Sequence, residues 1–332
     1  MSGKALSIKN ESKISFLAKE ISEFIKRGSS TAEKLSATIR EIKSQTGIKS
    51  LKDLEQPHID NMITGLKNNV SSGNMSLSNA NSYISSINNI VKYVGRDDLH
   101  AIKASDFGLS RNISEKDGIN KENTRETAYA FKTWLNEKYA KTNDLRYAAI
   151  KHAVSIQSVN LRLRESLQIK LLNKDLYENI LKVSAKGDGS KNSRERQIKL
   201  NPEQKAVLLE ARAFLKENHL KNLNIGTIKQ GRNFANNTLK SFRTETNLYF
   251  HYHGERHWTA HEAYKEAWKL KRYSNIECRA RTGDSKSEWL GGISETTGLS
   301  KSEFQRMDKE IRQEISRNLG HERIEITNRY LG

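Results

Sequence analysis

Cysteine is nearly missing from this sequence of 332 residues, in which Cys278 is the single example. One thiol excludes a disulfide framework and any zinc site built from cysteines. Proline is almost as scarce, with only two residues. Because proline removes a backbone donor and breaks helices, its scarcity favours a mainly helical chain.

Long hydrophobic runs are also missing. No stretch approaches the ~18 consecutive apolar residues that a membrane-spanning helix needs. Residues 1–11 lack the apolar core of a secretion signal. We therefore expect no membrane association and a location in a reducing cytoplasm, at the nucleoid.

Acidic residues are outnumbered. The chain has 57 Lys and Arg against 39 Asp and Glu, which gives a net charge of +18 and a pI near 9.7. Such an excess favours a polyanionic partner, with nucleic acid first. On charge alone, a soluble protein with a solvated basic face is the alternative. The length is sufficient for two domains.

Apolar residues recur at helical spacing in four stretches near the N-terminus. The stretches are Ile14, Leu17, Ile21, Phe24 and Ile25; then Leu35, Ile39 and Ile42; then Ile59, Met62, Ile63 and Leu66; and finally Ala80, Tyr83, Ile84, Ile87, Ile90, Val91 and Val94. We predict a helical bundle over residues 1–104. Residues 105–123 are polar and turn-forming, so we interpret them as a linker to a second domain over residues 124–332.

Sheet signals are confined to one place in the second domain. Residues 176–183 alternate in polarity, residues 185–191 form a glycine-rich turn, and residues 196–200 have the pattern of a returning strand. The apolar spacing is helical in the rest of the domain. The expected fold class is mainly α with a small antiparallel β-sheet.

Three short motifs carry groups that suit phosphate chemistry. Gly320 is placed to end a helix, so His321 lies at a turn, and Tyr330 follows nine residues later. Upstream, Arg162 lies in a Leu-Arg-Leu-Arg-Glu motif, and a His-Gly-Glu-Arg motif ends at Arg256. Guanidinium groups hold phosphate oxygens in a bidentate manner and stay charged. A phenol near a chain end is usually a packing residue, but beside a bound phosphate it is a candidate nucleophile.

In chain order, Arg162, the pair His253 and Arg256, a Leu-Gly-His motif at His321 and finally Tyr330 resemble the tyrosine recombinases, or phage integrase family. The resemblance implies a helical core-binding domain that clamps DNA, followed by an integrase-type catalytic domain. It implies that the two arginines hold the scissile phosphate, that His253 moves protons, and that His321 donates to a non-bridging oxygen. Tyr330 would attack phosphorus to give a 3′-phosphotyrosine and a free 5′-hydroxyl, with no ATP, metal or other cofactor.

Further roles follow from the same resemblance. Lys186, on the predicted hairpin turn, is the expected acid for the leaving oxygen, with Lys191 as the runner-up. Glu165 is the expected ion-pair partner of the first arginine, and His257 is a buried structural histidine. Arg164 competes with the first arginine for the catalytic role, but the Leu-Arg-x-x-Glu register favours the first.

The sequence departs from the family pattern in several places. Asn160 stands where the family commonly has glycine. A basic insert near residues 271–306 has no counterpart in minimal members and would pack on DNA or on a neighbouring protomer. Only two residues follow Tyr330. The C-terminal segment that many relatives dock on the next protomer would therefore be missing, relocated or lost to truncation.

Candidate DNA contacts gather in two places. Short polar side chains at the start of the fourth predicted helix suit phosphate contacts, although plain capping explains them equally well. The second place is a polar, basic stretch over residues 222–243. The candidates are Ser78, Asn79, Asn81, Ser82, Lys229, Arg232, Lys240 and Arg243, together with Lys191. The resemblance implies double-stranded DNA as the partner, a monomer without DNA, a homotetramer on paired DNA sites, and possible accessory DNA-bending proteins.

Three other functions fit parts of the pattern. A type IB topoisomerase shares the cutting chemistry without pairing two sites. A DNA-binding protein with an inactive site would keep the charge, but the complete set of catalytic residues argues against it. A histidine-metal hydrolase would use His253, His257 and His261, which recur at four-residue steps, although no carboxylate or cysteine pattern completes a zinc site. We favour a site-specific recombinase that integrates or excises a mobile element.

Overall fold

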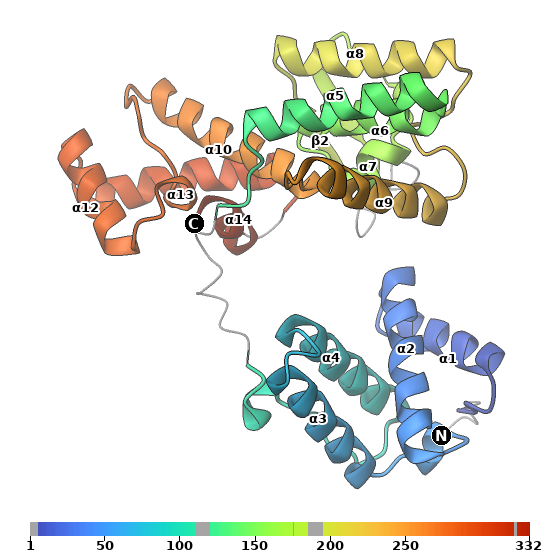
Figure 1. Cartoon of the computed structure of the whole chain (residues 1–332). Helices are drawn as coiled ribbons and strands as arrows, with labels where there is room; N and C mark the ends of the chain where they lie inside the picture. Colours follow the sequence, from blue (N-terminus) through green and yellow to red (C-terminus); the bar gives the residue numbers. More distant parts are fainter. Residues whose placement is uncertain (1–5, 111–119, 175, 185–194, 322–323) are drawn as a thin grey trace. The chain divides into compact units, whose positions relative to one another are not determined.

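The computed structural model describes residues 6–110, 120–174, 176–184, 195–321 and 324–332. The chain forms two compact units, Met1–Ile113 and Ser114–Gly332, and each is described by itself (Figure 1). The break between them falls inside the range interpreted as a linker. Within the described ranges, no helix is long and apolar enough to cross a bilayer.

The first unit is a bundle of α1 (Glu11–Phe24), α2 (Ser29–Thr46), α3 (Gln56–Ser71) and α4 (Leu77–Val94), with short 3₁₀ helices η1 (Leu51–Asp53) and η2 (Ala104–Phe107). The four predicted helices are confirmed. Their apolar stripes face one another, so that Leu17, Ile39 and Ile87 are fully buried. Phe24 is the exception, with 47% of its surface exposed. It is the last residue of α1, and its ring packs edge-on against Tyr93 with centroids 5.4 Å apart.

The bundle continues past residue 104, although the linker was expected to begin at residue 105. Leu109 is buried in the core of the bundle. The side-chain amide of Asn81 donates to the Leu109 carbonyl at 2.8 Å, which fixes this segment against α4. Residues up to Leu109 are therefore held by the first unit rather than free to act as a hinge.

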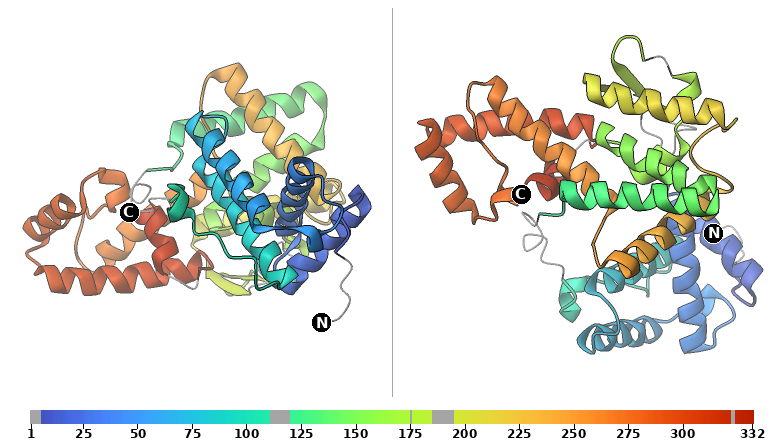
Figure 2. Two further views of the ribbon diagram at one scale, coloured as in Figure 1. Left: turned by 90° about the horizontal axis from the view of Figure 1, so that it is seen from below. Right: turned by 45° about the horizontal axis from the view of Figure 1, so that its top comes forward.

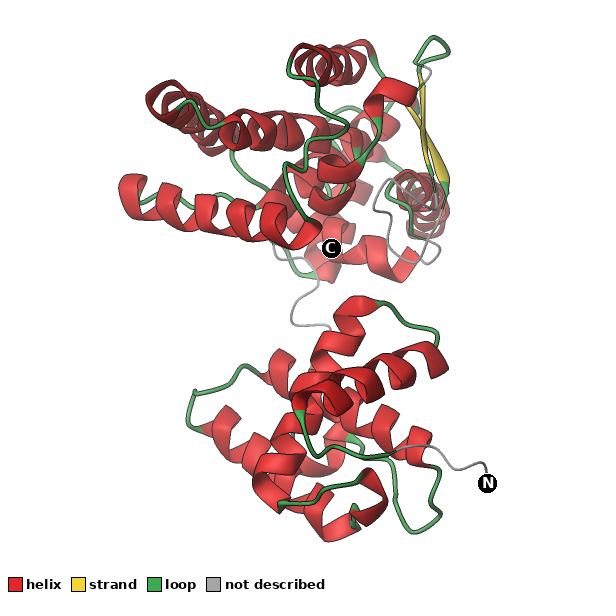
Figure 3. Cartoon of the chain, turned by 90° about the vertical axis from the view of Figure 1, so that its right-hand side faces the viewer, coloured by secondary structure: helices red, strands yellow, loops and turns green. Residues whose placement is uncertain are grey.

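The second unit is also mainly helical. Its elements are α5 (Arg125–Thr142), α6 (Leu145–Ser155), η4 (Ile156–Val159), α7 (Leu163–Gln168), η5 (Leu171–Asn173), β1 (Ile180–Val183), β2 (Arg196–Lys199), α8 (Pro202–Glu217), α9 (Ile228–Thr246), α10 (Tyr252–Leu270), α11 (Arg279–Thr282), α12 (Lys286–Thr297), α13 (Lys301–Asn318) and α14 (Ile324–Leu331). Strands β1 and β2 pair antiparallel, with Leu181 opposite Ile198 (Figure 3). The expected fold class, mainly α with a small antiparallel sheet, is confirmed.

Two apolar cores hold the second unit together. The first gathers α5, α6, the hairpin, α8 and α9 around Phe131, whose ring stacks on Phe250 with centroids 4.3 Å apart. The second joins α10, α12, α13 and α14, with Trp268 stacked on Phe304 at 5.0 Å. Figures 1 and 2 show α12 and α13 at one end of this unit and α8 at the other. Because α10 packs on η4 as well as on α13 and α14, its first turns lie between the two cores.

The insert near residues 271–306 packs on its own unit. Trp289 of α12 meets Phe304 edge-on at 5.2 Å. Its indole N–H donates to the Glu277 carbonyl at 3.0 Å. The insert therefore builds part of the second core, next to the helix that carries Tyr330.

Candidate active site

The first turns of α10 place three side chains on one face. His253, Arg256 and His257 are three and four residues apart, so they project together. Helix α14 brings Tyr330 against this face, where it is 4% exposed. The phenol oxygen lies 2.8 Å from His253 Nε2 and accepts a hydrogen bond from Arg256 Nε at 3.3 Å. The phenol ring stacks on His257 with centroids 4.3 Å apart.

A tight turn carries the chain from α13 toward this site. Helix α13 ends at Asn318, and Gly320 adopts the left-handed conformation with φ +68°, which glycine reaches without strain. The backbone N–H of His321 then donates to the Ser316 carbonyl at 2.8 Å. A Cβ at position 320 would lie 2.9 Å from Arg196 Cδ, so glycine also permits the close approach of β2. The expectations that Gly320 ends a helix and that His321 lies at a turn are confirmed.

Arg256 is fully buried, and its guanidinium is fixed from several sides. It donates to the backbone carbonyls of Asn160 and Leu319 and lies 3.4 Å from His321 Nε2. Asn160 has φ +60°, a left-handed conformation that asparagine tolerates, so it can occupy a position where glycine is common. Burial lowers the pKa of Arg256 to about 10, which leaves the group charged at neutral pH.

Arg162 precedes α7 and is held by Glu165. Its backbone N–H and its Nη1 donate to the two carboxylate oxygens, both at 2.8 Å. Arg196 of β2 binds the same carboxylate at 3.0 and 2.7 Å. Sequence reasoning missed Arg196, because only the folded hairpin brings it to α7. The side chain of Arg162 is 24% exposed while that of Glu165 is fully buried, so the arginine can reach a ligand that the carboxylate cannot.

Removing the charge of Glu165 is expected to destabilise the second unit at neutral pH. Burial raises the pKa of this carboxyl, but the hydrogen bonds and charges of Arg196 and Arg162 outweigh burial and lower the pKa from 4.5 to about 2. The contribution, on the order of 3 kcal/mol, is present above pH 4.5 and is lost as the pH falls toward 2. Urea denaturation of Glu165→Gln should show a deficit of about that size at pH 7, shrinking as the pH falls. A deficit that does not depend on pH would contradict this assignment.

Neutral imidazoles surround the phenol. Burial, together with the charges of Arg256 and Arg162, lowers the pKa of His253 to about 4 and that of His321 to about 3. Both rings are therefore uncharged at neutral pH. Because Arg256 Nη2 can only donate, His321 Nε2 accepts and the proton of this ring lies on Nδ1. That buried Nδ1 has no hydrogen-bond partner in the described part of the chain.

Another histidine of α10, His261, fixes the backbone of the helix that bears the phenol. Its Nε2 lies 2.6 Å from the Tyr330 carbonyl oxygen, and its Nδ1 lies 2.8 Å from Glu122 Oε2. Arg281 of α11 binds the same carboxylate at 2.9 Å. Burial disfavours the charged ring, but contacts with Cys278 and Glu122 outweigh burial and raise the pKa of His261 to about 9. The ring is therefore protonated at neutral pH and donates on both sides.

Sequence reasoning did not find the contacts among His261, Glu122 and Arg281. It considered His261 only as a possible metal ligand and placed Glu122 in the linker. The two residues are 139 positions apart, so no local spacing connects them. The one weak signal was the position of Glu122, a carboxylate just before α5, the first helix of the second unit.

The stabilisation from His261 is expected to disappear as the pH rises through 9. Its pKa is raised above the unfolded value of 6.5, so its contribution is fully present below pH 6.5 and is lost near pH 9. This contribution is on the order of 3 kcal/mol. In urea denaturation, His261→Asn should lose the most stability at about pH 6 and the least at about pH 9.5. His219→Asn, at an exposed position of the same unit, should show no such trend.

The α10 histidines that were weighed as zinc ligands contact one another and other protein groups. Among the residues that the structure describes, no group of three His, Cys, Asp or Glu side chains is arranged to hold a metal ion. The rings of His253 and His257 lie edge to face with centroids 5.5 Å apart, and those of His257 and His261 at 6.2 Å. The outer two direct their nitrogens at the phenol oxygen and at protein oxygens instead.

Two predicted lysines lie outside the described residues. These are Lys186 and Lys191, and their roles stay predictions. Arg164, the competitor for the catalytic role, is exposed and bonds Gln168 at 3.2 Å. The charge of Arg162, in contrast, contributes to lowering the pKa values of His253 and His321.

Four predicted DNA contacts share one face of α9. They are Lys229, Arg232, Lys240 and Arg243, and all four are exposed. Their steps of three, eight and three residues return to the same side of a helix. The Arg243 guanidinium lies 3.8 Å over the ring of Tyr249. We call these four residues the basic ridge, and its contact with DNA stays a prediction.

Two of the predicted contacts of the first unit, Asn81 and Ser82, line a depression of about 440 Å³. Its lining residues are Thr31, Lys34, Asn81, Ser82, Ser85, Ser86 and Asn89. Asn79 accepts a hydrogen bond from Lys34 Nζ at 2.7 Å, and the carbonyl of Ser78 accepts one from Ser82 at 3.0 Å. The amide of Asn81 donates to two backbone carbonyls of its own unit, which gives it a structural role.

No protein-family model and no curated protein sequence matches this chain. Several solved structures do. A Tn1549 transposon integrase in complex with transposon right end DNA is 13% identical with a TM-score of 0.55, covering 96% of this chain and 94% of that one. The XerH site-specific recombinase bound to palindromic difH substrate is 15% identical with a TM-score of 0.54, and the match covers 97% of this chain and 80% of that one. A lambda integrase tetramer bound to a Holliday junction is 12% identical with a TM-score of 0.54, and the match covers 100% of this chain and 79% of that one. The chain therefore has the fold of the tyrosine recombinases.

Proposed function

We propose that this chain is a site-specific DNA recombinase that cuts and rejoins strands through a 3′-phosphotyrosine at Tyr330. The observation that carries the proposal is the placement of Tyr330 Oη 2.8 Å from His253 Nε2 and 3.3 Å from Arg256 Nε. The fold is shared with integrases and recombinases solved on DNA. The net charge of +18 suits a DNA ligand.

Two arginines supply the positive charge that attack on a phosphodiester needs. Arg256 is fixed by backbone carbonyls and Arg162 by Glu165, so neither has to reorganise as the pentavalent phosphorus forms. The partly exposed Arg162 can bind a non-bridging oxygen, and the charge of the buried Arg256 favours a phenolate beside it. In this mechanism the arginines take the place of metal charge.

His253 is the proposed base for the phenol. Because Arg256 can only donate to Tyr330 Oη, the phenol hydrogen can point at His253 Nε2. The pKa of His253, about 4, keeps this nitrogen unprotonated at neutral pH. A bound phosphodiester would offset the arginine charges that lower that pKa, so the base would become stronger when the substrate is present.

His321 and Lys186 complete the proposed reaction. The Nδ1–H of His321, which lacks a partner in the described chain, donates to a non-bridging phosphate oxygen. Lys186 protonates the 5′-oxygen as it leaves. The new phosphotyrosine ester keeps the energy of the broken bond, so a 5′-hydroxyl from another strand can displace Tyr330 without ATP.

The proposed substrate is double-stranded DNA with two paired sites, bound by four protomers. Lambda integrase, which shares the fold, has been solved as a tetramer on a Holliday junction. We propose integration or excision of a mobile element as the biological reaction, with accessory DNA-bending proteins as possible partners. The basic ridge of α9 would contact the DNA backbone, as would Ser78 and Asn79 of the first unit.

The test uses nicked duplexes that cover the DNA on both sides of the coding sequence. Cleavage through a 3′-phosphotyrosine should transfer the 5′-label of the cut strand to the protein, which then migrates slowly on a denaturing gel. A plasmid with two such sites should also be recombined. Relaxation of supercoiled plasmid without exchange would indicate a topoisomerase, and binding without a covalent product would indicate an inactive DNA-binding protein. Either result would overturn the proposal.

A further inference from the structure

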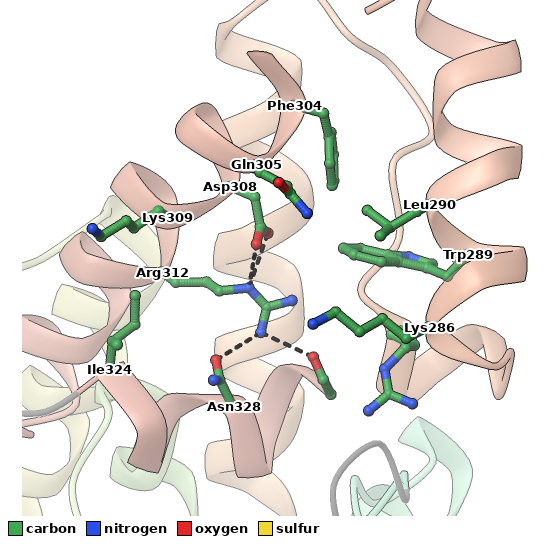
Figure 4. Close-up of a pocket in the computed structure, with 12 residues that line it drawn as sticks. Lys286, Trp289, Leu290, Phe304, Gln305, Asp308, Lys309, Arg312, Ile324 and Asn328 are labelled. Carbon is green, nitrogen blue, oxygen red and sulfur yellow. Dashed lines mark hydrogen bonds and ion pairs between the residues drawn. The ribbon is translucent and has the colours of Figure 1, made fainter. Parts of the chain in front are cut away.

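A cavity of about 560 Å³ lies beside α14 (Figure 4). Helices α11, α12, α13 and α14 all contribute to its walls. The lining residues are Arg279, Lys286, Trp289, Leu290, Phe304, Gln305, Asp308, Lys309, Arg312, Ile324, Asn328 and Gly332. Its volume is typical of ligand pockets, and none of the proposed catalytic residues lines it.

One wall of this cavity is apolar. Trp289 and Phe304 meet edge to face with centroids 5.2 Å apart, and Leu290 lies beside the indole in Figure 4. The indole N–H of Trp289 is already bonded to the Glu277 carbonyl at 3.0 Å, so the ring offers the cavity an apolar face. Such a wall suits an aliphatic or aromatic side chain of a ligand.

The opposite wall presents positive charge. Arg312 is 6% exposed. Its Nε donates to Asp308 at 2.8 Å, and its Nη1 donates to Asn328 Oδ1 and the Gly332 carbonyl, both at 3.0 Å. Its Nη2 has no hydrogen-bond partner among the described residues, and in Figure 4 this nitrogen faces the same space as the ammonium of Lys286.

Two cations directed at one space repel each other unless an anion lies between them. Asp308 pairs with Arg312 at 2.8 Å and accepts from the Tyr264 hydroxyl at 2.6 Å, so among the described lining residues no acidic side chain pairs with Lys286. Among the described residues that line the cavity, four side chains are basic and Asp308 is the one acidic side chain. Room is therefore left for an added negative charge beside Lys286.

We propose that this cavity binds an acidic peptide segment of a partner protein, with a carboxylate between Lys286 and Arg312 and an apolar side chain against Trp289. A DNA phosphate would satisfy the cations but would leave the indole and Leu290 without an apolar counterpart, so a peptide fits the two walls together better. Asn328 and Gly332, which both accept hydrogen bonds from Arg312, lie two residues before and two residues after Tyr330. If the proposed function holds, a bound peptide would also change the yield of covalent DNA complex.

The experiment measures fluorescence anisotropy of a fluorescein-labelled Phe-Glu-Leu-Glu peptide with the whole chain at moderate salt. We expect saturable binding that weakens about tenfold for Lys286→Glu and less than about twofold for Lys301→Glu, a matched change of charge outside the cavity. Phe-Gln-Leu-Gln and Gly-Glu-Gly-Glu, which lack the charge or the apolar groups, should each bind about tenfold more weakly. Binding is measured without DNA, so failure of this inference is distinct from failure of the recombinase proposal.

Three outcomes would overturn the inference. The first is equal peptide affinity for Lys286→Glu and the unchanged chain. The second is equal binding of Gly-Glu-Gly-Glu or full competition by inorganic phosphate, which would mean a site for any small anion. The third is a Lys286→Glu defect in duplex DNA binding with peptide binding intact, which would make the cavity part of the DNA surface.

Discussion

Tyr330→Phe is expected to abolish covalent attachment to DNA, with a yield at least about 10⁴-fold below that of the unchanged chain. Duplex binding should change less than about threefold, since the lost hydroxyl is not a backbone contact. The phenylalanine ring keeps the stacking on His257 at 4.3 Å and the burial of α14. What disappears is the single oxygen between His253 and Arg256 that can attack phosphorus.

The measurement combines a mobility-shift titration with retention of 5′-labelled duplex on a denaturing gel. Tyr129→Phe removes a hydroxyl from an exposed tyrosine of the same unit and should behave like the unchanged chain. Labelled duplex retained by Tyr330→Phe under denaturing conditions would assign the nucleophile to another residue. Loss of duplex binding would mean that the phenol hydroxyl also supports the fold or the DNA-binding surface.

The helices and the hairpin could be predicted because their signals are local. Apolar spacing is set by the 3.6-residue repeat, and Gly320 marks a helix end by its left-handed conformation. The relation of Tyr330 to His321 and Arg256 came from the order of the motifs and from the nine-residue step between His321 and Tyr330. The structure adds that the phenol oxygen, the guanidinium and both neutral imidazoles meet within hydrogen-bond reach.

Glu165 was predicted as the partner of Arg162, but the other contacts that hold the site in place could not be predicted. Arg196 of the hairpin binds Glu165 of α7, and Glu122 of the predicted linker binds both His261 and Arg281 of the insert. Each contact joins segments distant in sequence, so it depends on tertiary packing that no periodicity encodes. The insert likewise gave no local sign that Trp289 would pack into the core beside α14.

Arg256→Lys is expected to lower the cleavage rate about 10³-fold, although the positive charge is kept. A lysine has one ammonium in place of a planar fork, so it cannot bind the carbonyls of Asn160 and Leu319 and also donate to Tyr330. Because lysine has fewer donors than arginine, buried carbonyls are left unpaired, and each unpaired carbonyl lowers the free energy of unfolding by about 1–3 kcal/mol. The phenol then loses the donor that fixes its oxygen opposite His253.

The rate is measured by single-turnover formation of the covalent complex, and folding is followed by thermal denaturation of the same preparation. Arg243→Lys, on the exposed basic ridge of α9, keeps the charge without a buried role and should cleave within about threefold of the unchanged chain. If Arg256→Lys cleaved as fast as Arg243→Lys, charge alone would suffice, and the fixed fork would have no catalytic role. A rate loss at intact DNA binding and folding would instead show that the direction of these donors, and not only their charge, activates Tyr330.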